Sequence, residues 1–474
     1  MFKDFILKSH LLSGLLLAGS LSACGTANVI GAMLSPTAAV QHAASGTLLE
    51  HVSLANSRDM LVRVNDPAAL ARIQQQLQIT GQDLLSAEAG LYRLRIPVGQ
   101  SLTRSLSAVA QLPGVAYAEP NPSFKLPDFQ IQQEAAVQPN DPNYGLQWNM
   151  RSSRINQAWG LTNQNPTLKI AVIDSGVDPN HPDLVDHLEQ LEDIYNEEHG
   201  PDIYRNISGD RINFGGRDGN GHGTHVIGVI AAAMNNQVGV AGVAGGGVRI
   251  IPIKATDYAG NTDAATLTAA FQRAIDRDAR VINISIGGPA SKSTQALTDV
   301  IRLALQRNIS IISATGNESN RASGLISPIT VPAAYPGVIA VGAHTEFDQV
   351  ASYSNGGGEI DLLAPGGAGR SRVQEEGQQI WSTWPSYHTY EYFQRRVTST
   401  YYAATSGTSM ACPHVTGVVA LMLAREPQLT PAQIRSRLIA TADDMGPAGF
   451  DQDSGYGKLN ALRALRWTSH DARD

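Results

Sequence analysis

Hydrophobic and polar residues follow two different patterns along this chain, and the pattern changes near residue 140. In the first part, four short segments alternate like half-buried strands, at Asp59–Val64, Asp83–Ala87, Leu91–Ile96 and Val115–Glu119. Two segments between them have helical spacing, at Pro67–Gln78 and Leu102–Leu112. The order βαββαβ predicts a small α+β domain in which two helices cover one face of a sheet.

In the second part, nearly continuous apolar segments alternate with helical ones. The apolar segments are typical of buried strands, at Ile170–Ile173, Ile250–Lys254, Val281–Ile286, Ile309–Ala314 and Val338–Ala343. The helical segments lie at Ala264–Arg277, Thr294–Gln306, Pro413–Ala424 and Pro431–Thr441. This alternation predicts an α/β domain, with a mainly parallel sheet covered by helices on both faces. Two polar inserts, at about 193–211 and 371–401, are expected to be surface loops of unassigned role.

The first 24 residues have the architecture of an export signal. An apolar stretch over Leu11–Leu21 is too short for a comfortable membrane span and ends in small residues before Cys24. The tetrad Leu21-Ser22-Ala23-Cys24 resembles a bacterial lipobox, in which the cysteine thiol is acylated before cleavage. We therefore expect export across the cytoplasmic membrane, a lipid anchor on Cys24 and a tether over 25–44. An ordinary secretory signal that happens to contain a cysteine is the alternative.

The composition of the chain limits the kinds of molecule and the kinds of chemistry that are expected for it. The net charge of -7 is spread along the chain without a basic patch, so nucleic acid is not an expected partner. The two cysteines, Cys24 and Cys412, would be able to pair in an oxidising compartment, but acylation of Cys24 would prevent this. Cys412 is expected to pack as a small apolar residue rather than to serve redox or metal chemistry.

Two residues of the second part suit acid–base chemistry. Asp174 follows the strand Ile170–Ile173 at its carboxyl end, where open α/β sheets build their sites. His222 lies between two glycines where a helical segment begins, a position that suits a general base. A zinc site that includes His225 is the alternative, but the acidic neighbour of a His-Glu-x-x-His helix and further ligands are missing. For His225 alone, a hydrogen-bonded structural role is the better interpretation.

Ser409 lies where another helix is expected to begin. Gly407 permits a tight approach, and Pro413 is expected in the first turn, where no intrahelical donor is lost. At a helix N-terminus, free N–H groups and the positive end of the dipole stabilise a developing oxyanion. The simpler alternative is that Thr408 or Ser409 only caps the helix.

Taken together, these segments resemble the signature motifs of the subtilisin family of serine proteases. The motifs are Asp174-Ser175-Gly176, Gly221-His222-Gly223-Thr224-His225-Val226 and Gly407-Thr408-Ser409-Met410-Ala411, and Val281–Gly288 and Ala314–Glu318 resemble the family's substrate-pairing strand and oxyanion-hole segment. The resemblance spans roughly 140–463 and implies a subtilisin-like three-layer sandwich and a serine-type endopeptidase. It implies Asp174 as the orienting acid, His222 as the base and Ser409 as the nucleophile. It also implies that the Asn317 amide and the Ser409 N–H are the oxyanion donors.

The resemblance further implies how substrates bind. The backbone of Ser285, Ile286 and Gly287 is expected to pair with an extended peptide as an added strand. The pocket-lining motifs contain no acidic cluster, so apolar residues are expected before the cut rather than Arg or Lys. We expect no catalytic cofactor, and a monomer whose partners are protein or peptide substrates.

A structural calcium site is also implied by the resemblance. Asp141, Asp183 and the loop that contains Asn236, Val238 and Val240 are similar to a calcium site of the family. Carboxylate, amide and carbonyl oxygens are suitable ligands for this cation. The alternative is that Asp141 caps a turn and that Asn236 only permits a tight loop.

The small N-terminal domain resembles the propeptides of subtilases, which assist folding and inhibit the enzyme. We accordingly expect a zymogen that cleaves itself between about Lys125 and Asn140. The expected organisation is a lipoprotein signal peptide at 1–24, a tether at 25–44, a propeptide domain at 45–126, a linker at 127–139 and a peptidase domain at 140–466.

Two other classes of protein are considered. A catalytically idle lipoprotein that binds peptides in the same groove would have no physical need to keep Asp174, His222, Asn317 and Ser409 together. An esterase of the α/β-hydrolase type would need a Gly-x-Ser-x-Gly elbow and the order Ser, Asp, His, which the sequence around Ser409 does not show.

Overall fold

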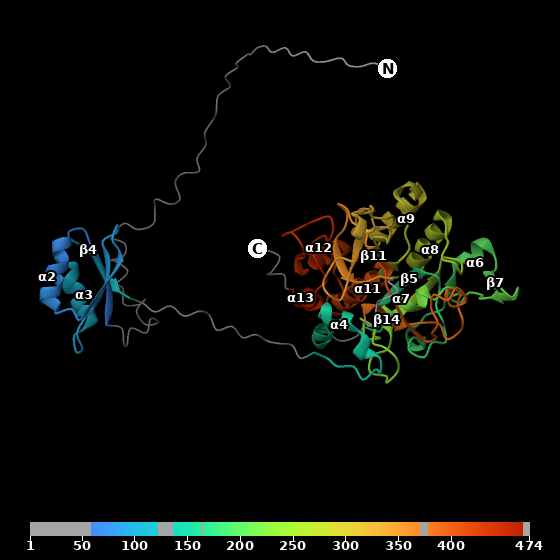
Figure 1. The fold of residues 1–474 in the computed structure, drawn as a ribbon, viewed down its shortest axis with the longest axis horizontal. Helices are drawn as coiled ribbons and strands as arrows, with labels where there is room; N and C mark the ends of the chain where they lie inside the picture. Colours follow the sequence, from blue (N-terminus) through green and yellow to red (C-terminus); the bar gives the residue numbers. More distant parts are fainter. Residues whose placement is uncertain (1–57, 122–135, 163–164, 370–377, 468–474) are drawn as a thin grey trace, which may run out of the picture. The chain divides into compact units, whose positions relative to one another are not determined.

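The computed structural model describes residues 58–121, 136–162, 165–369 and 378–467 (Figure 1). The predicted export signal, the lipobox with Cys24, the tether and most of the predicted linker lie outside these residues. The chain divides into two compact units, Met1–Ile131 and Gln132–Asp474. Within the described residues, no helix has both the length and the apolar character that crossing a membrane requires.

The described part of the first unit has the predicted βαββαβ order. Its elements are β1 (Asp59–Val64), α2 (Pro67–Leu77), β2 (Gly81–Ser86), β3 (Leu91–Arg95), α3 (Leu102–Ala110) and β4 (Val115–Pro120). The strands form an antiparallel sheet in the order β2-β3-β1-β4. Met60, Val62 and Val64 of β1 share one buried face with Ile73 of α2 and Val109 of α3. Residues two apart point to the same side of a strand, so the alternating pattern predicted these elements correctly.

The second unit is built on a seven-stranded sheet in which each strand runs parallel to its neighbours. In spatial order the strands are β13 (Leu362–Pro365), β12 (Ile339–His344), β11 (Ser310–Ala314), β10 (Val281–Ile284), β5 (Lys169–Asp174), β9 (Arg249–Lys254) and β6 (Glu192–Asp193). The expected α/β fold class is confirmed. All five predicted strands are present, whereas β13 and β6 were not predicted.

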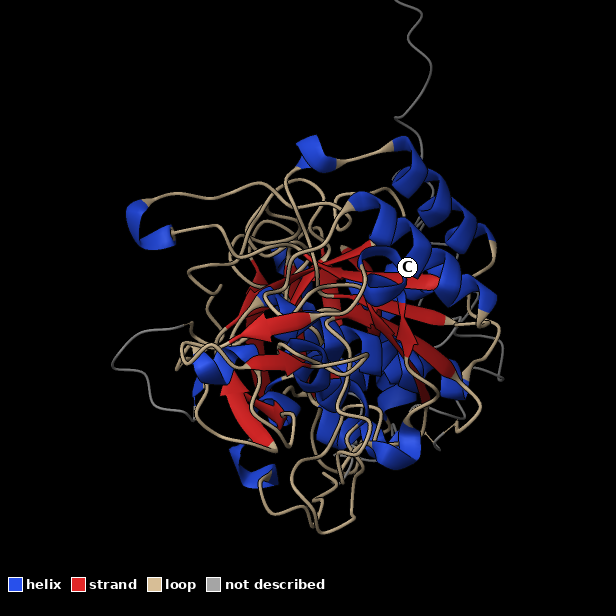
Figure 2. Cartoon of the chain, turned by 90° about the vertical axis from the view of Figure 1, so that its right-hand side faces the viewer, coloured by secondary structure: helices blue, strands red, loops and turns tan. Residues whose placement is uncertain are grey.

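Helices cover both faces of this sheet (Figure 2). The main ones are α7 (His222–Ala231), α8 (Ala264–Asp276), α9 (Gln295–Gln306) and α11 (Thr408–Arg425). Ile170 and Val172 of β5 belong to a hydrophobic core that includes α7 and α11. Ala171 and Ile173 belong to a second core, with α8 and α9. A strand buried on both faces needs an apolar residue at every position, which explains the continuous apolar segments of the sequence.

Shorter elements complete the second unit. They are α4 (Trp148–Ser152), α5 (Ile155–Ala158), α6 (Ile194–His199), β7 (Ile203–Arg205), β8 (Arg211–Asn213), β14 (Ile380–Thr383), α10 (Tyr390–Phe393), β15 (Tyr402–Thr405), α12 (Pro431–Thr441) and α13 (Ala461–Arg466). The helix α12 has the predicted bounds and begins with a capping box, in which Thr430 and Gln433 each accept a hydrogen bond from the other's backbone N–H.

The helix α11 begins earlier than predicted. It starts at Thr408, so Pro413 lies inside the helix, and its expected position in the first turn is wrong. A proline there lacks the N–H that would bond to the carbonyl four residues earlier, which belongs to Ser409. The Ser409 carbonyl instead accepts a hydrogen bond from Ser285 Oγ at 3.0 Å. This bond ties the first turn of α11 to the residue that follows β10.

The first polar insert is more than the surface loop that was expected. It contains α6 and β7, and β7 pairs with β8. Its Asp202 forms an ion pair with Lys254 at 3.0 Å, and the two side chains are only 1% and 0% exposed. Lys254 is paired in register with Asp174, and its Nζ also donates to the Ser175 carbonyl at 3.2 Å. The insert therefore supplies the counter-charge for a buried cation beside the end of β5.

The second insert, where the structure describes it, is also partly buried. It contains β14, α10 and β15, and β14 pairs with β15. Ser382, Thr383 and Trp384 are buried, so this segment is part of the packed body of the unit. Neither insert could be assigned from its polar composition, because the few buried residues that anchor each one are spread among exposed ones.

Replacing Asp202 by Asn removes the carboxylate that forms an ion pair with the buried ammonium group of Lys254. We expect the free energy of unfolding to fall by about 3–5 kcal/mol. Asp299→Asn is the matched control, because Asp299 and Arg302 are 56% and 59% exposed and such a pair is worth at most about 1 kcal/mol. Urea denaturation measures both changes. Equal losses of unfolding free energy from Asp202→Asn and Asp299→Asn would contradict the assignment of Asp202 as the counter-charge of Lys254.

Candidate active site

The candidate site lies at the carboxyl edge of the parallel sheet. From β5 the chain forms β6 and β9 on one side of β5 and then β10 on the other. Loops diverge at such a switch point and leave a crevice where ligands bind in α/β proteins. Ile173 pairs with Ile284 in register, so Asp174 at the end of β5 and Ser285 just beyond β10 are neighbours across the sheet.

His222 is the first residue of α7, and its ring contacts Asp174. His222 Nδ1 lies 2.7 Å from Asp174 Oδ1. Burial by itself lowers the pKa of His222, but the charge and hydrogen bond of Asp174, with contributions from Asp218 and Glu391, raise it above its ordinary value. The proton on Nδ1 faces the carboxylate, which leaves Nε2 as the nitrogen that can accept a proton.

Asp218 holds the loop before His222, a role that the sequence interpretation missed. Its side chain is fully buried, and its two oxygens accept five hydrogen bonds of 2.7–3.1 Å. The donors are the N–H groups of Asn220, Gly221 and Thr224 and the hydroxyls of Thr224 and Ser175. The only signal in the sequence was an aspartate just before a glycine-flanked histidine.

Ser409 is the second residue of α11, and it is 9% exposed. Its hydroxyl donates to the Ser285 carbonyl at 3.2 Å, and no hydrogen bond within the described residues joins it to His222. The structure therefore brings Asp174 and His222 into direct contact and links Ser409 to the strand end beside Asp174. Rotation about the Cα–Cβ bond of Ser409 redirects its hydroxyl to another staggered position without moving the backbone.

Asn317 follows β11, and its amide is oriented by the first residue of α11. Asn317 Oδ1 accepts hydrogen bonds from the N–H and the hydroxyl of Thr408, at 2.8 and 3.0 Å. Because a backbone N–H needs an acceptor, this contact fixes the oxygen toward Thr408 and leaves Nδ2 as a donor. The N–H of Ser409 makes no hydrogen bond within the described residues. Two donors are thus available where α11 begins.

The predicted substrate-pairing segment lies beyond the end of β10. Ser285 is buried, Ile286 is half-buried and Gly287 is exposed. Within the described residues, the backbone groups of Ile286 and Gly287 make no hydrogen bond. Unpaired groups at the end of a strand are a template on which an extended peptide can add. A side chain at position 287 would clash with Thr330, since an added Cβ would lie 2.3 Å from Thr330 Oγ1.

His225 and Cys412 occupy structural environments. His225 Nε2 lies 3.1 Å from the Ile380 carbonyl and 3.2 Å from the Ala403 carbonyl, so the ring joins α7 to β14 and β15. Burial lowers the pKa of His225 to about 3, which keeps the ring neutral. Burial raises the pKa of the Cys412 thiol, and its Sγ lies 3.3 Å from Asn283 Oδ1. A neutral, buried thiol is a poor nucleophile.

The residues of the predicted calcium site lie together. Asp183 accepts from Asn236 Nδ2 at 2.8 Å and from the Val240 N–H at 3.0 Å. Asp141 accepts from the Asn236 N–H at 3.2 Å, and the Val238 N–H donates to Asn236 Oδ1 at 2.8 Å. Burial raises the pKa of Asp183 to about 6, and the charge of Asp141 adds to the effect.

The chemistry of this cluster fits a hard cation. Asp141 and Asp183 are buried, and neither pairs with Lys or Arg in the part of the chain that the structure describes. Two buried carboxylates without a counter-charge are destabilising, and a divalent cation would remove that cost. No group of three or more His, Cys, Asp or Glu side chains is arranged to hold a metal within those residues, so amide and carbonyl oxygens would have to complete the ligands.

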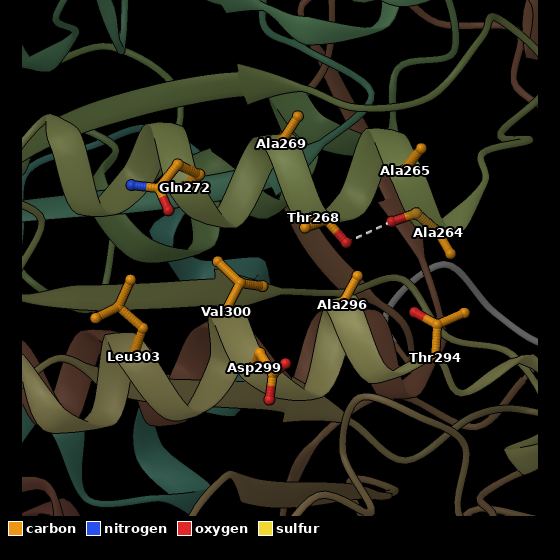
Figure 3. A pocket seen from close by; sticks show the side chains of 10 residues that line it. All are labelled: Ala264, Ala265, Thr268, Ala269, Gln272, Thr294, Ala296, Asp299, Val300 and Leu303. Atoms are coloured by element: carbon orange, nitrogen blue, oxygen red, sulfur yellow. Dashed lines mark hydrogen bonds between the residues drawn. The ribbon is translucent and has the colours of Figure 1, made fainter.

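A hollow of about 780 Å³ between α8 and α9 is separate from this site (Figure 3). Alanines line much of it, and its polar groups already have partners. Thr268 Oγ1 donates to the Ala264 carbonyl at 2.7 Å, and Asp299 pairs with Arg302. None of the predicted catalytic or substrate-binding residues lines the hollow, so it is not part of the candidate active site.

Comparison with protein families agrees with the fold and with the geometry of the site. The model of the subtilase family matches residues 165–457, which is more than half of the chain. The chain therefore belongs to the subtilase family, and it is a subtilisin-like serine endopeptidase. This confirms the family that the sequence motifs indicated.

Individual relatives and solved structures support this assignment. The chain is 36% identical to subtilisin from Bacillus pumilus over 307 residues, which is 65% of the chain and 93% of that subtilisin. It is 32% identical over 357 residues to the minor extracellular protease Epr of Bacillus subtilis, which is 75% of the chain and about half (47%) of Epr. Fervidolysin from Fervidobacterium pennivorans, described as a keratinolytic enzyme related to subtilisin, matches with a TM-score of 0.56 and 26% identity, over 87% of the chain and 61% of fervidolysin. A protease from Pseudoalteromonas arctica matches with a TM-score of 0.56 and 28% identity, over 69% of the chain and 98% of that protease.

We expect the His222 ring to titrate above the ordinary histidine pKa of about 6.5. Asp174→Asn should lower this pKa, because burial then acts without the opposing charge of the carboxylate. NMR titration of histidine side chains in a Ser409→Ala background measures the shift. Asp263→Asn, which removes the partner of the partly exposed His199, is the control and should leave His222 unchanged. An equal titration midpoint of His222 with and without Asp174→Asn would contradict the contact of Asp174 with the His222 ring.

Proposed function

We propose that this chain hydrolyses peptide bonds in proteins through an acyl-enzyme, with Ser409 as the nucleophile, His222 as the general base and Asp174 as the group that orients the base. The observation that carries the proposal is the 2.7 Å contact of Asp174 Oδ1 with His222 Nδ1 at the carboxyl edge of the sheet. A serine hydroxyl is a weak nucleophile at neutral pH unless a base removes its proton during attack. His222 Nε2 serves as this base, and its support is the contact of Nδ1 with Asp174.

The reaction proceeds in two half-steps. Ser409 Oγ turns from the Ser285 carbonyl toward His222 and attacks the scissile carbonyl carbon, while Nε2 takes its proton. Asp174 stabilises the imidazolium that forms. Negative charge on the former carbonyl oxygen is stabilised by Asn317 Nδ2 and the Ser409 N–H. His222 then protonates the leaving amine, and a water molecule, activated by the same ring, releases the acyl group.

The substrate binds as an extended strand along Ser285, Ile286 and Gly287. Main-chain pairing recognises any extended segment, which favours flexible or unfolded chains over folded ones. Support for this comes from the backbone groups of Ile286 and Gly287, which make no hydrogen bond within the described part of the chain. Because the matching motifs contain no acidic cluster, the enzyme prefers apolar residues before the cut. A cleavage profile dominated by Arg or Lys at this position would contradict that preference.

The first unit serves as a propeptide that the enzyme itself removes. Support for this comes from its βαββαβ fold and from its place in the sequence ahead of the peptidase domain at 140–466. The chain is exported through its signal at 1–24 and is held to the cell envelope by a lipid on Cys24. Relatedness to the minor extracellular protease Epr is consistent with export.

A structural calcium ion belongs to the proposed function as a stabiliser rather than as a catalytic group. Asp141, Asp183 and Asn236 would hold it, together with carbonyl oxygens of the loop that includes Val238 and Val240. When bound, it would neutralise the two buried carboxylates. The Asn236 side chain would then offer its oxygen, Oδ1, in place of the nitrogen, Nδ2, that donates to Asp183 in this structure.

Asn317→Ala should lower kcat by about 10²–10³ with little change in KM, because the donor acts on charge that develops only in the transition state. This magnitude is the one known for subtilisin itself. Asn317→Asp keeps the acceptor for Thr408 without the donor, and it should lose as much activity. Asn320→Ala, three residues further on, is the matched control. Steady-state kinetics on a short peptide substrate test this, and full activity of Asn317→Ala would contradict the proposal.

Removing calcium with a chelator should lower the Tm of the Ser409→Ala protein. An ion present at about a hundred times its Kd contributes about 2.7 kcal/mol, which corresponds to roughly 4 °C for a domain of this size, because the entropy of unfolding grows with chain length. Asp183→Asn should make the Tm insensitive to the chelator. Calorimetry with and without added Ca²⁺ measures this. If the Ser409→Ala protein with Asp183 intact has the same Tm in chelator and in added Ca²⁺, no stabilising ion is bound at this site.

A further inference from the structure

The second insert contacts the loop that leads to His222 at nearly every residue. This loop, 217–221, contains two glycines and continues into α7 at His222. A glycine-rich segment has many accessible conformations, so it does not hold a particular shape by itself. The contacting residues of the insert are Trp384, Tyr387 and Tyr390, and they use three different kinds of interaction.

Tyr387 contacts the beginning of the loop in two ways. The Arg217 guanidinium lies over its ring, 4.5 Å from the centroid, in the geometry of a cation–π contact. Its hydroxyl donates to the Asp218 carbonyl at 3.2 Å. Burial raises the pKa of Tyr387, which keeps the hydroxyl protonated and able to donate. The insert thus holds the backbone of Asp218, the residue whose carboxylate accepts hydrogen bonds from the rest of the loop.

Tyr390 contacts the middle of the loop through its backbone. Its N–H donates to the Gly219 carbonyl at 2.8 Å. Tyr390 is the first residue of α10, and Thr389 is the N-cap. The first N–H of a helix has no intrahelical partner, so it is free to make this bond. The contact therefore uses a donor that α10 itself does not need.

Trp384 packs against the last residue of the loop. It is 3% exposed, and Gly221 has a φ of +108°. An added Cβ at Gly221 would lie 2.2 Å from Trp384 Cζ2. The indole therefore occupies the space that any side chain would need there. The residue immediately before His222 is held between this ring and Asp218, which accepts its N–H.

The insert is itself anchored to the first insert by aromatic rings. Tyr390 lies 5.2 Å from Tyr204 of β7 and 5.2 Å from Tyr258, measured between ring centroids. Tyr204 also contacts Phe393 of α10 at 5.6 Å and Tyr258 at 5.2 Å. Asn220 of the loop donates to the Tyr258 carbonyl at 2.9 Å. The first insert thus supports the second one through Tyr204, and Tyr258, whose ring contacts both inserts, also binds the loop.

We propose that the segment 384–390 is a positioning element that braces the loop 217–221 and thereby fixes where His222 stands. Tyr387 and Tyr390 are positioning residues, since they act on His222 only through the loop. This inference rests on the proposed role of His222 as the general base. A brace of this kind is important in the transition state, when the ring must receive a proton along one direction. Its loss should therefore lower kcat while KM stays nearly constant.

The decisive comparison is Tyr390→Pro with Tyr390→Ala. Both variants lose the aromatic ring, but only proline also lacks the N–H and places a ring carbon toward the Gly219 carbonyl. Proline is tolerated at the first position of a helix, and Thr389 has φ −92° and ψ 174°, which a following proline permits. The pair therefore isolates the backbone contact of residue 390 with the Gly219 carbonyl.

Steady-state kinetics on a short peptide substrate should give a kcat for Tyr390→Pro that is about tenfold below that of Tyr390→Ala, with KM values within twofold. Tyr387→Phe, which loses only the hydroxyl, should lower kcat about threefold. The control is Tyr456→Phe, whose residue is 39% exposed and packs on Phe450. Equal kcat values for Tyr390→Pro and Tyr390→Ala, or an equal loss in Tyr456→Phe, would overturn the proposal.

Hydrogen exchange provides a readout that does not depend on catalysis. In a Ser409→Ala background, the amides of 217–222 should exchange faster in Tyr390→Pro than in Tyr390→Ala, while those of the central strands stay unchanged. Unchanged exchange in the loop, or faster exchange throughout the unit, would overturn the brace. If the unaltered protein hydrolyses no peptide although the exchange result holds, the proposed function fails and the brace remains a property of the fold.

Discussion

One buried contact organises the site, that of the Asp174 carboxylate with the His222 ring. Asp174 ends a strand that is covered on both faces, where an unpaired charge would cost several kcal/mol. Its Oδ1 lies 2.7 Å from His222 Nδ1 and accepts from the Ser175 N–H, whereas Oδ2 has no hydrogen-bond partner within the described residues. The same contact that makes the buried carboxylate tolerable also makes the ring a stronger base. Stability and reactivity therefore depend on the same two side chains.

Placing a serine beside this pair requires segments that are far apart in the chain. The break in the hydrogen-bond ladder of α11 at Pro413 frees the Ser409 carbonyl for Ser285 Oγ. Asn317 accepts from the first N–H of the same helix. Two of the strand ends thus hold the N-terminus of α11 by hydrogen bonds, while the Ser409 N–H has no hydrogen-bond partner among the residues that the structure describes. Hydrogen bonds thus fix the backbone at the beginning of α11, and a donor remains available where negative charge would develop.

Much of the fold could be predicted because burial on both faces leaves a clear pattern. The segment Ile170–Ile173 is apolar at every position, whereas β13 is only four residues long and contains Pro365, so its pattern is too weak to recognise. Asp174, His222, Ser409 and Asn317 could be named as candidates because they lie in segments that resemble family motifs. No spacing in the sequence predicts that Asp174 and His222 touch. Asp202 and Tyr390 were hidden in polar inserts, because their role comes from tertiary packing and not from local sequence.

Self-removal of the N-terminal unit tests the central claim, that Ser409 is the nucleophile of an endopeptidase, most directly. The measurement is the intact mass and the N-terminal sequence of the purified protein, compared with Ser409→Ala expressed in the same way. We expect the unaltered protein to start between about Lys125 and Asn140 and the Ser409→Ala protein to keep the preceding unit. The same N-terminus on both proteins, with masses that differ only by the oxygen atom lost in the substitution, would contradict the central claim, because removal of the unit would then not depend on the hydroxyl of Ser409.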